Sequence, residues 1–110
     1  MRIIKWKYVI DYCKNDRKMR NAFDRFYEIT KDSNWRKPQD VINSFSNTDL
    51  VTCKKAKTSR IVFNVGTNKY RMIVGYYFAP NQMYLYIKFV GTHEDYIKID
   101  VCKIDMFKRK

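Results

Sequence analysis

Residues 60–96, RIVFNVGTNKYRMIVGYYFAPNQMYLYIKFVGTHEDY, constrain the fold of this chain more than any other stretch. Three runs rich in β-branched and aromatic residues are separated by short polar turns, which predicts three consecutive antiparallel strands. Successive strand residues point to opposite sides, so the alternation defines two faces. The first face is apolar and consists of Ile61, Phe63, Val65, Tyr70, Met72, Val74, Tyr76, Phe78, Met83, Leu85, Ile87 and Phe89. The second contains no acid and consists of Arg60, Val62, Asn64, Lys69, Arg71, Ile73, Gly75, Tyr77, Tyr84, Tyr86, Lys88 and Val90.

The residues before this stretch have the periodicity of helices, which would cover the apolar face. Helical spacing begins near Lys5, and a second, strongly amphipathic helix follows a cap at Asn15 or Asp16. Pro38 is placed to begin a third, short helix. Short strands are predicted at residues 2–4, at a sheet edge, and at residues 50–53. Thr92, with Asp95 three residues later, predicts the start of a short helix near the C-terminus.

These elements predict an α+β fold in which N-terminal helices pack on one face of an antiparallel sheet and a short helix follows it. The chain of 110 residues is expected to form a single domain over residues 1–110, with a basic tail at about 101–110 whose end, residues 106–110, is expected to be loose.

The formal charge of +12, from 23 Lys and Arg against 11 Asp and Glu, favours a polyanionic partner. Nucleic acid or an acidic protein would satisfy it, and solvated basic surface explains part of the charge. No apolar run approaches the ~20 residues of a membrane-spanning helix, and the first residues do not have the pattern of a signal peptide. We therefore expect no membrane partner and a cytoplasmic location. The sequence contains three cysteines, Cys13, Cys53 and Cys102, an odd number without CxxC spacing. We therefore expect reduced thiols, and neither a zinc site nor a disulfide framework.

Two motifs carry a resemblance to a known family. The first is F-N-x-x-x-N-x-x-R, formed by Phe63, Asn64, Asn68 and Arg71, and the second is G-T-H-x-x-Y, formed by Gly91, Thr92, His93 and Tyr96. Together with MRII and NWRKPQDV they resemble the HigB branch of the RelE superfamily, the toxins of toxin–antitoxin systems, from residue 1 to about residue 100. The resemblance implies an mRNA-cleaving endoribonuclease (an mRNA interferase) that usually acts on the translating ribosome. It also implies neutralisation by a helix-turn-helix antitoxin of the HigA kind.

Metal-independent RNA cleavage needs a proton acceptor for the 2′-hydroxyl, a cation for the phosphate and a proton donor for the leaving oxygen. The sequence contains no acidic cluster or His/Cys set that would hold a metal, so no metal or other cofactor is expected. We predict Arg71 as the cation for the phosphate, because its forked guanidinium suits a phosphate. Lys88, on the next strand and the same face, is predicted as a second cation. His93, the only histidine, is predicted to transfer a proton. Tyr96, one turn later, is predicted to position His93, to stack a base or to serve as the acid.

Other residues of the second face are predicted to contact RNA. Arg60 and Lys69 would follow the backbone, Tyr84 and Tyr86 would stack bases, and Asn64 and Asn68 would read base edges or a 2′-hydroxyl. The candidate residues also have simpler interpretations. The cations can be solvated surface charges, the tyrosines ordinary strand residues, Asn68 a turn residue, and His93 a histidine bonded to a nearby carbonyl.

Two other functions fit the same composition. A non-catalytic RNA-binding domain would use the same cations and tyrosines, but replacing His93 would hardly affect it. An interaction protein would need its charge only for an acidic partner and would not bind RNA alone.

Overall fold

A computed structural model describes residues 2–45, 48–53, 58–66 and 69–106. The backbone forms a five-stranded sheet in the order β1-β5-β4-β3-β2. The strands are β1 (Arg2–Ile4), β2 (Thr48–Cys53), β3 (Thr58–Val65), β4 (Tyr70–Phe78) and β5 (Met83–Thr92). The pairs β2–β3, β3–β4 and β4–β5 are antiparallel, as the turns predict for the last three strands. β1 lies at an edge, as expected, but it runs parallel to β5, so the sheet is mixed.

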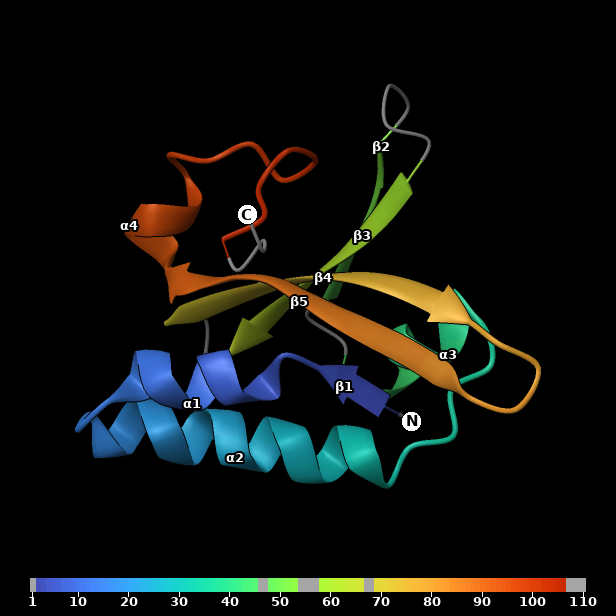
Figure 1. Cartoon of the computed structure of the whole chain (residues 1–110), viewed down its shortest axis with the longest axis horizontal. Helices are drawn as coiled ribbons and strands as arrows, with labels where there is room; N and C mark the ends of the chain where they lie inside the picture. The colour runs from blue at the N-terminus through green and yellow to red at the C-terminus, as the bar shows by residue number, and fades with distance from the viewer. Residues whose placement is uncertain (1, 46–47, 54–57, 67–68, 107–110) are drawn as a thin grey trace.

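Helices cover one face of this sheet (Figure 1). They are α1 (Trp6–Cys13), α2 (Arg17–Lys31) and α3 (Pro38–Ser44). The Asp16 side chain accepts a hydrogen bond from the Met19 backbone N–H and caps α2, while Pro38 occupies the first turn of α3, as predicted. The short helix α4 (His93–Tyr96) follows β5, and Thr92 and Asp95 form the expected capping box. The α+β fold class is therefore confirmed.

The main core lies between the helices and the predicted apolar face. Phe23 and Phe26 of α2 contact aromatic rings on the sheet and in neighbouring segments, and Trp35 stacks on Phe63 with ring centroids 6.3 Å apart. The Trp35 indole N–H also donates to the Ser44 hydroxyl at 2.8 Å, so this buried ring has a partner for its polar atom. The core lies on one face of the sheet only, and the second face, which carries most of the predicted site residues, lies outside it.

A β-bulge changes the faces of the last part of β5. Ile73 of β4 pairs with Phe89, whereas the next residue, Val74, pairs with Ile87, so Lys88 is an extra residue in β5. Phe89 consequently packs on the second face and Val90 in the main core. The predicted placement of these two residues was wrong, because uniform alternation cannot register one extra residue.

The C-terminal segment (residues 97–106) crosses the second face of the sheet (Figure 1). Its Ile99, Val101 and Ile104 side chains join a small apolar cluster on that face. The cluster is completed by Val62, Ile73 and Phe89, with Val51 and Tyr96 at its margin. Residues 101–105 therefore pack on the sheet, and the Met106 backbone N–H donates to the Lys88 carbonyl at 2.8 Å. Residues 107–110 lie outside the described part, and the loose tail and the extent of the domain stay predictions.

A disulfide joins Cys102 in the C-terminal segment to Cys53 at the end of β2, with Cα atoms 5.5 Å apart. The prediction of three reduced thiols is therefore wrong for this pair, and only Cys13, which is buried, is a free thiol. Spacing in the sequence does not determine connectivity, and the two cysteines meet only because the segment returns over the sheet.

Candidate active site

Three of the predicted catalytic residues, Arg71, His93 and Tyr96, gather where β4 begins and β5 ends, whereas the fourth, Lys88, lies further along β5. Tyr70 of β4 pairs with Thr92 of β5, and the His93 backbone N–H donates to the Lys69 carbonyl at 3.3 Å. The chain then turns through α4, which brings Tyr96 back toward β4. Two segments that are far apart in the sequence therefore meet at one end of the sheet. One contains Lys69 and Arg71, and the other contains His93 and Tyr96.

Arg71 is the central cation of this group. It pairs with Asn64 on β3 and with Gly91 on β5, so the three residues form a row across the second face. Its guanidinium carbon lies 5.9 Å from the centroid of the Tyr96 ring, and its Nη1 donates to the Tyr70 carbonyl at 3.4 Å. The ring of Tyr96 is thus a cation–π partner that orients the guanidinium.

Gly91 makes room for this arrangement. A Cβ atom there would lie 2.7 Å from the Cζ of Phe89 and 3.2 Å from the Cβ of Asp95. Such a separation from Phe89 is shorter than van der Waals contact allows, and Phe89 is buried in the second apolar cluster. The glycine of the G-T-H-x-x-Y motif is therefore required by packing next to Arg71.

A shallow depression of about 390 Å³ lies at the same end of the sheet and is lined by Lys69, Tyr70, Thr92, His93 and Glu94. Arg71 is not among these residues, and the Tyr70 side chain packs against the main core, on the opposite face from Arg71. The Lys69 and His93 side chains are exposed to solvent. Burial raises the pKa of Tyr70, with a smaller contribution from the Asp16 carboxylate, so the Tyr70 hydroxyl keeps its proton at neutral pH. An anion in the depression would meet a lysine and a histidine, together with the carboxylate of Glu94.

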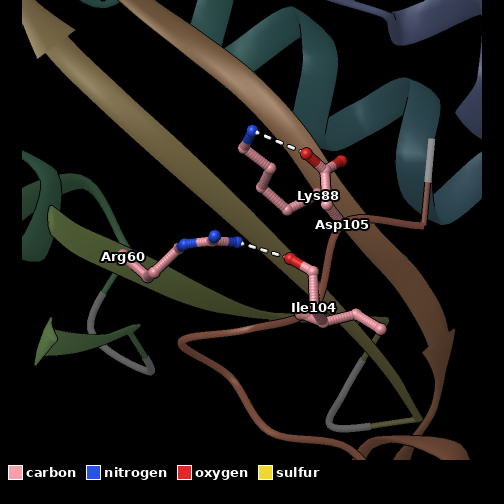
Figure 2. Close-up of polar contacts among 4 residues, drawn as sticks. All are labelled: Arg60, Lys88, Ile104 and Asp105. Carbon is pink, nitrogen blue, oxygen red and sulfur yellow. Dashed lines mark hydrogen bonds and ion pairs between the residues drawn. The ribbon is translucent and has the colours of Figure 1, made fainter. Parts of the chain in front are cut away.

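Arg60 and Lys88 lie further along the sheet, under the C-terminal segment (Figure 2). Arg60 pairs with Gly75, four residues along β4 from Arg71, which corresponds to about 13 Å. Its Nη1 donates to the Ile104 carbonyl at 2.8 Å, and the residue is only 9% exposed. Burial lowers the pKa of Arg60, an effect that the nearby Asp105 carboxylate partly offsets. The Nζ of Lys88 forms an ion pair with Oδ2 of Asp105 at 3.1 Å.

The tyrosines predicted to stack bases lie away from Arg71 along β5. Tyr84 pairs with Tyr77, whose ring centroid is 6.4 Å away, near the opposite end of the two strands. Tyr86 pairs with Gly75 and so lies in the same row as Arg60. Tyr77 and Tyr86 are exposed. The structure thus places Tyr86 in the middle of the second face and Tyr84 at the end opposite Arg71. Asn68 lies outside the described residues.

Sequence reasoning missed the C-terminal segment and its acid, Asp105. The available signal was the run of apolar residues at alternate positions, Ile97, Ile99 and Val101, followed by Ile104, which is untypical of a loose tail. Asp105 supplies the negative charge that the second face lacked in the strand pattern alone.

Two further properties concern metals and membranes. In residues 2–45, 48–53, 58–66 and 69–106, no three His, Cys, Asp or Glu side chains come together in a group that could hold a metal ion. None of the helices in this part of the chain is both long and apolar enough to span a bilayer.

The fold and this arrangement of motifs define a RelE-like domain. A family model described as HigB toxin, the RelE-like toxic component of a toxin–antitoxin system, matches residues 19–99. The chain therefore belongs to the HigB toxin family, and an antitoxin is its implied partner. A search of the curated proteins found no match.

Proposed function

We propose that this toxin is a metal-independent endoribonuclease that cleaves mRNA, and that Arg71, His93 and Tyr96 form its active site. The observation that carries the proposal is the packing of the Arg71 guanidinium against Tyr96, at the end of the sheet where His93 and Lys69 also lie. Membership of a family of toxic components supports a destructive activity, and a cation beside a proton-transferring group suits phosphodiester cleavage.

In the proposed reaction the 2′-hydroxyl of the RNA attacks the adjacent phosphorus atom and expels the 5′ oxygen of the next nucleotide. Arg71 neutralises the charge that grows on the phosphate oxygens, because its planar fork can donate two hydrogen bonds. His93 moves a proton at the 2′-hydroxyl or at the leaving oxygen. Tyr96 holds the guanidinium through its ring.

The remaining predicted RNA contacts divide by position. Lys69 and Asn64 lie close to Arg71 in the sheet register and would contact the nucleotides next to the cleaved bond. Tyr86, in the middle of the face, and Tyr84, at the far end, would stack bases further along the RNA, each with ~1–3 kcal/mol. Arg60 and Lys88 would contact phosphates only where the C-terminal segment leaves them accessible.

The natural substrate is proposed to be mRNA on translating ribosomes, and the antitoxin a helix-turn-helix protein of the HigA kind. The charge of +12 supports entry into a site walled by RNA, because a cationic protein is attracted to a polyanionic surface. The same charge suits an antitoxin that covers the toxin with acidic groups.

The test is cleavage of mRNA in a translating extract, mapped by primer extension with and without ribosomes. Wild type is compared with Arg71→Ala and His93→Ala. Arg25→Ala, which removes an exposed arginine from the helix layer, is the matched control. We expect Arg71→Ala to lower the cleavage rate by about 10²–10³-fold. Intact mRNA with wild type, together with salt-sensitive RNA binding, would replace the enzyme by a non-catalytic RNA-binding domain.

A further inference from the structure

The C-terminal segment contacts two cations in the middle of the second face, Arg60 and Lys88 (Figure 2). Arg60 donates to the Ile104 carbonyl at 2.8 Å, and Lys88 pairs with the Asp105 carboxylate at 3.1 Å. The Met106 N–H also donates to the Lys88 carbonyl at 2.8 Å. The oxygen atoms of Ile104 and Asp105 thus take the positions that phosphate oxygens would take on the same donors, since a carboxylate and a phosphate satisfy cationic donors in the same way.

These noncovalent contacts are of modest strength. The side chains of Lys88 and Asp105 are 24% and 22% exposed, and an ion pair near the surface contributes little. The second carboxylate oxygen of Asp105, Oδ1, is buried without a hydrogen-bond partner in the described part of the chain, which costs free energy. The segment itself contains no strand or α-helix that would hold its shape.

The segment has two further anchors: the apolar contacts of Ile99, Val101 and Ile104 with the cluster on the sheet, and the disulfide, which is covalent. The disulfide connects Cys102, between the apolar contacts of Ile99 and Ile104, to Cys53 on the edge strand β2. As long as the bond exists, the segment cannot move away from the sheet. When it is broken, only the noncovalent contacts oppose a polyanion that competes for Arg60 and Lys88.

We propose that Cys53–Cys102 is a reversible thiol–disulfide site that controls the access of RNA to Arg60 and Lys88. The inference rests on the proposed function in that it takes RNA as the ligand. In the disulfide form the C-terminal segment blocks both cations. In the dithiol form RNA phosphates displace Ile104 and Asp105, and the RNA-binding surface extends from Arg71 toward the tyrosines.

The opening reaction takes its two electrons from a dithiol reductant. Cys102 is the accessible sulfur, because it is half-buried whereas Cys53 is only 3% exposed. A reductant thiolate attacks the Cys102 sulfur, and Cys53 leaves as a thiolate that takes up a proton. The second reductant thiol, as its thiolate, then attacks the mixed disulfide and releases Cys102. The protein gains two thiols, and the reductant becomes a cyclic disulfide.

The experiment measures RNA binding by the full chain in its disulfide form and after reduction with dithiothreitol. The probe is a single-stranded RNA with 2′-O-methyl groups, which lacks the attacking hydroxyl and is therefore not cleaved. Fluorescence anisotropy gives the dissociation constant at several salt concentrations. Each phosphate neutralised on single-stranded RNA changes the slope of log K against log salt by about 0.7, so two newly accessible cations should steepen it by about 1.4.

Three variants sharpen the comparison. Cys53→Ala combined with Cys102→Ala should show the steep slope with and without dithiothreitol. Lys88→Gln should halve the difference between the two forms. Lys98→Gln, which removes an exposed cation from the same segment, is the matched control and should leave that difference unchanged.

Equal slopes in the two forms would overturn the proposal, and so would a reduced protein that has lost its far-ultraviolet circular dichroism, because the bond would then be only a structural staple. The result is separable from the proposed function. Cleavage that depends on Arg71, together with equal slopes, would leave the nuclease and remove the redox control. A slope difference without any cleavage would leave the redox control of RNA binding and remove the nuclease.

Discussion

Replacing Gly91 by alanine tests whether the packing beside Arg71 is as tight as the structure indicates. The added Cβ would lie 2.7 Å from the Cζ of Phe89, so the ring or the strand has to shift. Overpacking of a buried site costs about 1–3 kcal/mol. Alanine is better than glycine in a strand by roughly 0.5–1 kcal/mol, which offsets part of the cost. We therefore expect Gly91→Ala to lower the free energy of unfolding by about 0.5–2 kcal/mol.

Gly75→Ala is the matched control, because it lies on the same face of the neighbouring strand. Its added Cβ would have an ordinary contact of 3.4 Å with the Cε of Lys88, at the flexible end of a side chain. This variant should be as stable as wild type or more stable. Urea unfolding followed by tryptophan fluorescence gives both values, with the m-value unchanged. The packing argument would be refuted if Gly91→Ala were as stable as Gly75→Ala.

Three further predictions follow from individual contacts. Tyr96→Phe should keep the cleavage rate near that of wild type, whereas Tyr96→Leu, which removes the ring beside Arg71, should lower it by about 2- to 30-fold, as expected for about 0.5–2 kcal/mol; a large loss in Tyr96→Phe would instead assign proton transfer to the hydroxyl. Cys53→Ala with Cys102→Ala should lower the free energy of unfolding by up to about 4 kcal/mol in urea, because the bond closes a loop with a sequence separation of 49; a loss below about 1 kcal/mol would contradict this chain-entropy argument. Burial raises the pKa of Cys13, so the unfolded chain loses this proton first; stability that is complete below about pH 8.5 should fall as the pH rises through the folded pKa, and urea midpoints at neutral and alkaline pH should fall less in Cys13→Ala.

Much of the fold was predictable because local patterns and tertiary structure agree. Helical periodicity and the Asp16 cap predict α2, and the turns between alternating runs predict the three consecutive strands. The sequence pattern was insufficient where a single residue determines the strand register. The extra Lys88 leaves no trace in composition, yet it exchanges the faces of Phe89 and Val90. The three residues of β1 are too few to reveal a parallel pairing with β5.

The candidate site was predictable in a different sense. The motifs name Arg71, His93 and Tyr96, and the fold brings them to one end of the sheet, while their catalytic roles stay predictions. The relation of Lys88 to the site depended on a segment that is distant in the sequence. Alternation placed Lys88 on the second face, but only the return of the chain through the C-terminal segment pairs it with Asp105. Contacts of this kind depend on topology, which short-range patterns do not encode.

The bulge at Lys88 has a consequence for how this chain can vary in length. Because Lys88 is unmatched in β4, deleting it would give β5 an uninterrupted register in which Phe89 stays opposite Ile73 and Gly91 stays opposite Arg71. Deleting Val90 would instead turn Gly91 toward the helices, and Arg71 would lose the glycine that lies opposite it. We therefore expect homologous toxins to tolerate the loss of the residue at position 88, and insertions in the turn at residues 79–82, far more readily than an insertion or deletion between residues 89 and 91.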